Sequence, residues 1–144
     1  ASPWIAVMAG LAAVAGHNWS LYLKLTGGRG ITVTGGVLLV LTWKVAVVLL
    51  LVTLVGWLIS RSSALWVGIS LVLAPALCVL FGEPISITVL CAALLLIAVA
   101  KRLMSNRGTA EWGGSWPRVL MQRLIYDRDV ANRDEWVYRA PPET

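Results

Sequence analysis

Long blocks of apolar residues fill most of this chain, and short polar or glycine-rich stretches separate them. About 20 apolar residues in succession are enough to cross a membrane as a helix. The block 31–60 exceeds one upright span and holds Lys44 near its middle, where a charge costs several kcal/mol. Dividing the block at Thr42-Trp43-Lys44 removes that cost. The pattern therefore predicts five apolar, transmembrane or part-spanning helices, over residues 3–16, 31–41, 45–60, 62–81 and 85–103.

The basic residues support this division. With five helices, only Lys44 and Glu83 fall on one side of the membrane. The opposite side receives the other basic residues of the membrane segment, which are Lys24, Arg29, Arg61, Lys101, Arg102 and Arg107. The positive-inside rule makes that side cytoplasmic. We therefore expect a multi-pass protein whose glycine-rich loop at 27–30 and C-terminal tail are cytoplasmic.

Composition defines the fold class as an all-α integral membrane protein. Hydrophobic residues make up 58% of the chain and charged residues 13%, with a mean hydropathy of +0.79, well outside the soluble range. The net charge of +5 does not indicate a nucleic-acid partner, because the basic residues sit at the ends of apolar runs. Two cysteines inside apolar blocks and a single histidine give no metal-ligand spacing. No cofactor is implied.

The sequence changes character after Asn106, so we divide the chain into a membrane domain, 1–106, and a charged, tryptophan-bearing tail, 107–144. Residues 117–126 place four apolar side chains on one helical face, Leu120, Met121, Leu124 and Ile125. This pattern suits a helix at the membrane interface, and a solvated tail that orders against a protein partner is the alternative. We interpret Asp127-Arg128-Asp129 as a solvated or partner-facing surface.

The run Gly27-Gly28-Arg29-Gly30 is the candidate chemical feature. Glycines allow positive φ, and backbone N–H groups that converge in such a turn bind anions. A neighbouring guanidinium matches phosphate oxygens bidentately. The short helix expected at 31–41 would point the positive end of its dipole at the loop. The alternative is a glycine-rich turn that keeps an arginine on the cytoplasmic side.

These residues carry a resemblance to a known family. The stretch Gly16-His17-x-Trp19, then Leu23-Lys24-Leu25, Gly27-Gly28-Arg29-Gly30 and Gly36 resembles the bacterial acyl-phosphate-dependent glycerol-3-phosphate acyltransferases, the PlsY family. The similarity covers roughly residues 9–107. It implies a bacterial plasma-membrane enzyme that passes an acyl group from acyl phosphate to glycerol 3-phosphate, forming lysophosphatidate for phospholipid synthesis. It also implies that the loop Gly27, Gly28, Arg29 and Gly30 binds the substrate phosphate, supported by His17, Lys24 and Asn106.

The chain departs from the family pattern in three places. Arg29 stands where the family has lysine, and the two cations differ in geometry. The family's Ser-Gly-Asn motif and its arginine belong to an N-terminal portion that this sequence lacks, so we expect a longer protein. The family's final histidine is also absent, with only Asn106 to match that motif. We therefore assign no catalytic residue, and the alternative is a non-catalytic accessory subunit of a larger membrane complex, for example respiratory or photosynthetic.

Overall fold

The computed structural model describes residues 2–25, 27–104 and 115–129. All regular structure in these residues is helical. The elements are α1 (Pro3–Asn18), the 3-10 turn η1 (Leu21–Leu23), α2 (Ile31–Leu41), α3 (Trp43–Ser60), α4 (Ser63–Leu80), α5 (Ile85–Met104) and α6 (Trp116–Tyr126). Three helices, α3, α4 and α5, are long and apolar enough to cross a membrane, and α2 is a shorter apolar helix. The predicted fold class, an all-α membrane protein, is confirmed.

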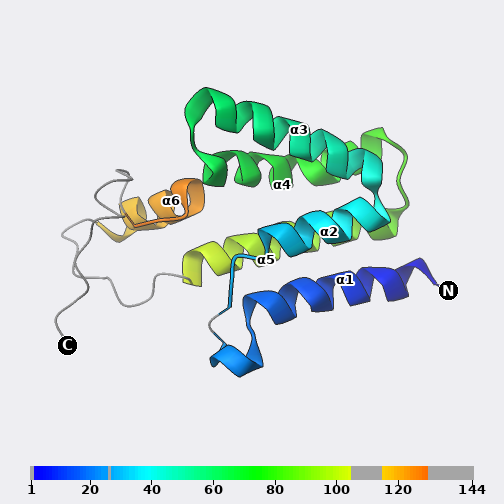
Figure 1. The fold of residues 1–144 in the computed structure, drawn as a ribbon, viewed down its shortest axis with the longest axis horizontal. Coiled ribbons are helices and arrows are strands. Elements are labelled where there is room, and N and C mark those ends of the chain that lie inside the picture. Colours follow the sequence, from blue (N-terminus) through cyan, green and yellow to red (C-terminus); the bar gives the residue numbers. More distant parts are fainter. Residues whose placement is uncertain (1, 26, 105–114, 130–144) are drawn as a thin grey trace.

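The division of the long apolar block is also confirmed. Thr42 alone separates α2 from α3, with a non-helical φ of −154° and ψ of 69°, and the chain reverses direction there (Figure 1). The Thr42 hydroxyl donates a 2.9 Å hydrogen bond to Oε1 of Glu83 in the α4–α5 turn. The two turns at this end of the helices are thereby joined, and Lys44 lies exposed in the first turn of α3.

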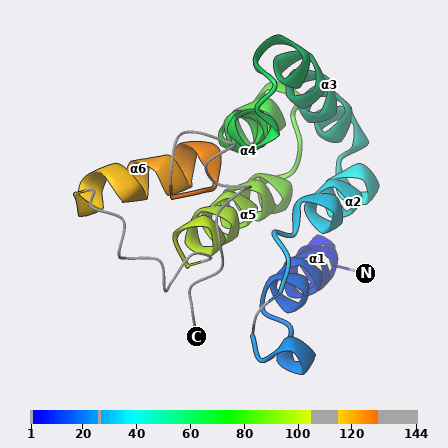
Figure 2. The same ribbon diagram turned by 60° about the vertical axis from the view of Figure 1, so that its left-hand side comes forward.

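Helices α1 to α5 pack as a closed ring. Successive helices run in opposite directions (Figure 1). α1 packs on α2 and α5, α3 packs on α2 and α4, and α4 packs on α5, an arrangement that Figure 2 shows from a second side. The buried core draws on all five helices, through Val7, Val14, Leu38, Val45, Leu49, Ala74, Cys78, Leu90, Cys91 and Leu94. The ring is therefore one packed unit whose first and fifth helices are neighbours.

Two glycines bring neighbouring helices of the ring close together. A Cβ at Gly56 of α3 would overlap the indole of Trp66 on α4, and one at Gly10 of α1 would lie 2.7 Å from Cγ1 of Val37 on α2. The Trp66 indole is also fixed by a 2.8 Å hydrogen bond from Nε1 to Oγ of Ser60. Small residues at such crossings are typical of membrane helices, because packing rather than the hydrophobic effect drives their association.

Helix α6 lies outside the ring and packs on α4 and α5 (Figure 2). A helix at 117–126 is thus confirmed, whereas its location at a membrane interface stays a prediction. The interpretation of Asp127 and Asp129 as a solvated surface is wrong. Asp129 is buried in an ion pair with Arg123 of α6, with 2.5 Å between Oδ1 and Nε, and Asp127 pairs with Arg29.

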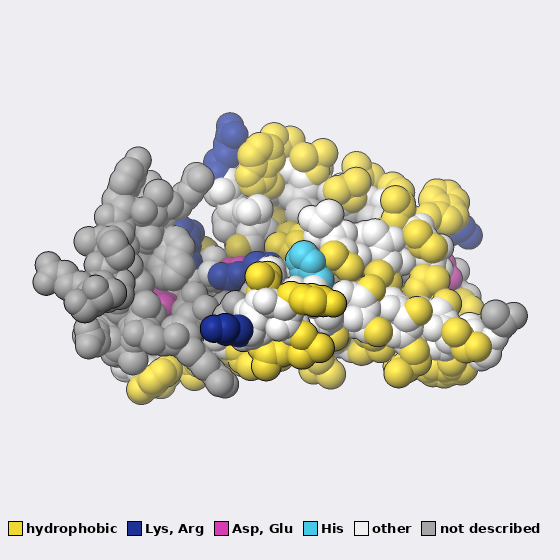
Figure 3. Space-filling model, turned by 60° about the horizontal axis from the view of Figure 1, so that its bottom comes forward, with side chains coloured by type: hydrophobic (Ala, Val, Ile, Leu, Met, Phe, Trp, Pro, Cys, Tyr) yellow, Lys and Arg dark blue, Asp and Glu magenta, His cyan; other side chains and the backbone are white. Residues whose placement is uncertain are grey.

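Hydrophobic side chains spread over the outer surface of the helices (Figure 3).

Candidate functional site

The glycine-rich loop lies directly on the C-terminal end of α1. The Gly27 N–H donates a 3.2 Å hydrogen bond to the backbone oxygen of Asn18, and a Cβ at Gly27 would overlap the backbone oxygen of His17. Gly30 adopts a left-handed φ of 66°, and a Cβ there would overlap Oδ1 of Asn18. The glycines are needed chiefly for close approach to α1, and the Gly27 N–H is already used within the protein.

The side chain of Lys101, near the end of α5, contacts the C-terminal end of α1. Its Nζ donates a 2.5 Å hydrogen bond to the backbone oxygen of Asn18 and lies 5.6 Å from the centroid of the Trp19 ring. A positive charge at the C-terminus of α1 is favourable, because unpaired carbonyls give a helix end partial negative charge. Lys101 therefore stabilises the C-terminal end of α1, against which the glycine-rich loop packs.

The side chain of Asn18 is the least satisfied polar group of this region. It is 1% exposed, and neither Oδ1 nor Nδ2 has a hydrogen-bond partner in the described part of the chain. A buried amide without partners costs roughly 1–3 kcal/mol per group, and such groups are rare in folded proteins. The Asn18 side chain lies against Gly30. Its amide therefore places one donor group and one acceptor beside the loop, neither of them used by another described residue.

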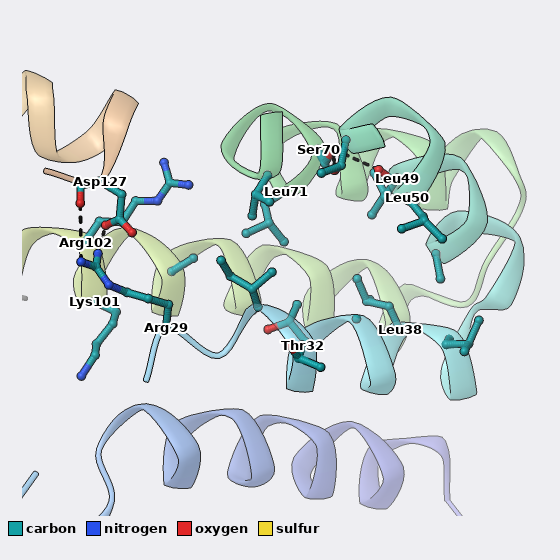
Figure 4. A pocket seen from close by; sticks show the side chains of 18 of the residues that line it. Arg29, Thr32, Leu38, Leu49, Leu50, Ser70, Leu71, Lys101, Arg102 and Asp127 are labelled. Carbon is teal, nitrogen blue, oxygen red and sulfur yellow. Dashed lines mark hydrogen bonds and ion pairs between the residues drawn. The ribbon is translucent and has the colours of Figure 1, made fainter. Parts of the chain in front are cut away.

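A cavity of about 410 Å³ opens next to the loop, between α2, α3, α4 and α5. Arg29, Lys101, Arg102 and Asp127 gather at one end of it (Figure 4). Toward the other end its walls are mainly apolar, with Leu38, Leu39, Leu49, Leu50 and Leu71 among the lining residues. The cavity is therefore amphipathic, with a cationic mouth and an apolar interior.

Hydroxyl groups also line this cavity. Thr32 and Thr34 stand in the first turns of α2, close to the loop in sequence. Thr53 and Ser70 share a 2.8 Å hydrogen bond between their hydroxyls, and Ser70 also donates to the backbone oxygen of Leu49 at 3.2 Å. The hydroxyls of Thr53 and Ser70 thus have hydrogen-bond partners within the protein, as polar groups inside a membrane require.

Arg29 points into the mouth of the cavity and is half-buried, with 34% of its side chain exposed. One guanidinium nitrogen forms an ion pair with Oδ1 of Asp127, and the other donates to the backbone oxygen of Asp127 at 3.5 Å. Burial lowers the pKa of Arg29, and the nearby charge of Asp129 raises it. An arginine remains cationic through such opposed shifts, so the loop presents a permanent positive charge.

Arg102 is the third cation of the mouth. It donates to the backbone oxygen of Leu124 in α6 and, at 2.6 Å, to that of Ala64 in α4. Lys101 and Arg102 escaped the sequence reasoning as site residues, because charges at the end of an apolar run also serve as topology signals. The signal that could have found them is their place at the end of the last span, on the same side as the loop.

The remaining predicted site residues lie in different surroundings. His17 is exposed in the last turn of α1, with Nε2 2.6 Å from where a Cβ of Gly28 would stand. Lys24 is exposed at the left-handed end of η1 and does not line the cavity. Asn106 lies outside the described residues. Across residues 2–25, 27–104 and 115–129, no group of three His, Cys, Asp or Glu side chains is placed to hold a metal ion.

The fold and the site define an integral α-helical membrane protein whose glycine-rich loop lies at the cationic mouth of an apolar cavity. The chain belongs to the glycerol-3-phosphate acyltransferase family, whose model matches residues 1–107. The PlsY resemblance read from the loop and its surroundings is thereby confirmed.

Individual relatives agree with this assignment. "Glycerol-3-phosphate acyltransferase 4" of Dehalococcoides mccartyi (strain CBDB1) is 30% identical over an alignment of 141 residues that covers 94% of this chain and 61% of that protein. The glycerol-3-phosphate acyltransferase of Halalkalibacterium halodurans is 38% identical over 88 residues, 58% of this chain and 42% of that protein. The names of these relatives give no support to the alternative of an accessory subunit.

A solved structure shares the fold. The crystal structure of PlsY, an integral membrane glycerol 3-phosphate acyltransferase in its glycerol 3-phosphate form, superposes with a TM-score of 0.69 at 18% identity. The superposition covers 94% of this chain and 61% of the PlsY chain. The chain thus spans about three fifths of the length of the Dehalococcoides mccartyi relative and of the PlsY structure.

Proposed function

We propose that this protein takes part in acyl transfer from acyl phosphate to glycerol 3-phosphate, with lysophosphatidate and inorganic phosphate as products. The observation that carries the proposal is the position of the family's glycine-rich loop at the cationic mouth of an apolar cavity. A phosphorylated head and a long acyl chain need these two environments side by side. The relatives named above as glycerol-3-phosphate acyltransferases support this reaction.

The phosphate group is assigned to the loop end. Arg29 supplies a guanidinium that binds two phosphate oxygens at once, and α2 starts at Ile31, directly after Gly30. The first turn of a helix offers N–H groups without intrahelical partners and partial positive charge. Lys101 and Arg102 add two further positive charges near the same mouth, which suits a dianion better than one cation would.

The amide of Asn18 is assigned to the polar part of the substrate. It donates through Nδ2 and accepts through Oδ1, as a ligand with both hydroxyls and phosphate oxygens requires. Because it is buried beside Gly30, a small adjustment of the loop would bring it into contact with a ligand held there. Asn18 was not among the site residues expected from the sequence.

The acyl chain is assigned to the apolar interior of the cavity, between α2, α3 and α4. Reaction requires the 1-hydroxyl oxygen of glycerol 3-phosphate to bond to the acyl carbon while the bond from that carbon to the phosphate oxygen breaks, and the hydroxyl proton passes to the departing phosphate. Acyl phosphate is already activated, so positioning of the two substrates and stabilisation of charge supply much of the rate. The three cations of the mouth offset the charge carried by both phosphates.

The mouth of the cavity is assigned to the cytoplasmic side. Arg29, Lys101 and Arg102 line it, and Arg61 stands in the turn between α3 and α4 at the same end of the ring. The excess of basic residues at one end is the pattern of a cytoplasmic face. Glycerol 3-phosphate, a soluble anion, would then reach the loop from the cytoplasm, and acyl phosphate from the membrane.

The test is an acyl-transfer assay on the protein in lipid nanodiscs, with acyl phosphate and labelled glycerol 3-phosphate. We expect Arg29→Ala to lower kcat/KM at least about 100-fold, because it removes the charged donor of the loop. Arg29→Lys restores the residue of the family motif and should keep measurable activity. Lys44→Ala, at the opposite end of the helices, is the control with the same loss of charge. Equal turnover by the wild type and Arg29→Ala would contradict the proposal.

A further inference from the structure

A second cavity lies between α6 and the ring, where α6 packs against α4 and α5 (Figure 2). Its volume is about 370 Å³. Apolar side chains of all three helices line it, among them Val72 of α4, Val99 of α5 and Ile125 of α6. Of the described residues in its wall, Arg102 alone carries a charge. The second cavity is therefore an apolar space with a single cation in its wall.

The cavity extends along α5 from Arg102 toward the middle of the helix. Leu95 also lines it and lies two helical turns before Arg102, or about 10 Å along the helix axis. Helix α5 is long and apolar enough to cross a membrane. Basic side chains at the end of such a helix lie at the level of the lipid headgroups. The second cavity thus runs from headgroup level into the hydrocarbon layer, with its charge at the headgroup end.

The guanidinium of Arg102 retains donors for a ligand. It donates to the backbone oxygens of Leu124 in α6 and Ala64 in α4, and a guanidinium has five N–H groups in all. Both acceptors are neutral, and the ion pairs of the described residues do not include Arg102. The group lies close to α4 at Gly68, where a Cβ would be 2.9 Å from Nη1. The described residues therefore bring no opposite charge to this cation.

From this arrangement we infer that the second cavity binds one anionic phospholipid of the surrounding bilayer. The lipid phosphate accepts hydrogen bonds from Arg102, since guanidinium and phosphate are well-matched partners and basic pockets between membrane helices bind lipid headgroups. One acyl chain fills the apolar space along α4 and α5. A zwitterionic headgroup would add a positive charge for which the described wall residues offer no acid, so phosphatidylglycerol is preferred to phosphatidylcholine. This site is separate from the proposed function and does not depend on it.

The test is native mass spectrometry of the protein in detergent, titrated separately with dioctanoyl phosphatidylglycerol and dioctanoyl phosphatidylcholine. We expect one phosphatidylglycerol to bind at least about tenfold more tightly than phosphatidylcholine. Arg102→Gln should abolish this preference, because a neutral amide replaces the cation. Arg61→Gln removes the same charge in the turn between α3 and α4, at the same end of the ring, and should keep the preference. Equal affinity of the wild type for the two lipids, or a preference retained in Arg102→Gln, overturns the inference.

Filling the cavity tests the place of the acyl chain. Val99→Trp puts an indole where the chain lies, and we expect phosphatidylglycerol to bind at least about tenfold more weakly. Val89→Trp is the matched control on α5, because Val89 is not among the described residues that line either cavity. If Val99→Trp does not fold, Val72→Trp on α4 replaces it, with Val79→Trp two turns further along α4 as its control. Unchanged binding in the filled variant, or an equal loss in its control, overturns the assignment to this cavity.

Discussion

The backbone oxygen of Asn18 accepts two hydrogen bonds, from Lys101 Nζ at 2.5 Å and from the Gly27 N–H at 3.2 Å. Lys101 lies 83 positions away in sequence. One carbonyl at the end of α1 thus joins the last helix of the ring to the glycine-rich loop. The geometry of the loop depends on this junction as much as on the loop's own residues.

Removal of the Lys101 side-chain charge is the direct test of that junction. Lys101→Met keeps most of the apolar stem and loses the charged hydrogen bond, so we expect about 2 kcal/mol of destabilisation. The thermal unfolding midpoint of the protein in detergent should fall. Lys44→Met, exposed in the first turn of α3, is the matched control and should leave the midpoint unchanged. Equal midpoints for the two variants would show that the Lys101 contact adds no stability.

Gly27→Ala should disrupt the loop. The added Cβ would overlap backbone oxygens of His17 and Asn18, and backbone atoms at a helix end cannot move aside as a flexible side chain does. We expect glycerol 3-phosphate binding to weaken more than about tenfold, measured by titration calorimetry. Gly16→Ala is the control, because among the described residues nothing beyond its chain neighbours and the nearby backbone of α1 lies within 4 Å of its Cβ position, and alanine favours the helix. Binding retained in Gly27→Ala would show that the loop can reposition without loss.

The buried ion pair of Arg123 and Asp129 should be needed to keep α6 packed against α4 and α5. Their side chains are 5% and 2% exposed, and removing one partner of such a pair costs about 3–5 kcal/mol. Asp129→Asn should therefore raise hydrogen–deuterium exchange over Trp116–Tyr126, while α3 and α4 keep their protection. The double variant Arg123→Met with Asp129→Leu removes both charges and should regain much of the protection. Exchange over α6 that stays at the wild-type level in Asp129→Asn would contradict this assignment.

Cys78 and Cys91 should resist thiol reagents in the folded protein. Both are fully buried between α4 and α5, with 3.4 Å between their sulfur atoms. We expect no labelling by N-ethylmaleimide in nanodiscs and labelling of both residues after denaturation in sodium dodecyl sulfate, read by mass spectrometry. Ser70→Cys, at a buried position that lines the cavity, offers a comparison site that a small reagent can reach through the mouth. Rapid labelling of Cys78 or Cys91 would show that α4 and α5 separate readily.

The sequence predicted the helices well because the membrane imposes simple rules. Apolar length, the cost of Lys44 at mid-bilayer and the distribution of basic residues were enough to divide the block 31–60 at Thr42. The loop 27–30 was recognised from its glycines and from its surroundings in the family motif. These features are local, and a single sequence displays them.

The electrostatics of the site could not be predicted in the same way. The partners of Arg29 and Arg123 are aspartates of a segment whose charge pattern looks like any solvated tail. The contact between Lys101 and Asn18 depends on the closing of the ring, which pairs the first helix with the fifth. Hydropathy does not encode which helices become neighbours. The unpaired amide of Asn18 is likewise visible only once burial and contacts are known.

Closure of the ring also fixes the order in which the protein becomes competent during synthesis. The loop leaves the ribosome about 70 residues before Lys101 does, yet Lys101 supplies one of the two hydrogen bonds on the Asn18 oxygen. Helices α1 to α4 can enter the bilayer before α5 exists, because each satisfies its own backbone. The loop acquires its final geometry only when α5 docks against α1. A nascent chain therefore inserts before the proposed phosphate site is complete, and the last helix of the ring to arrive completes it.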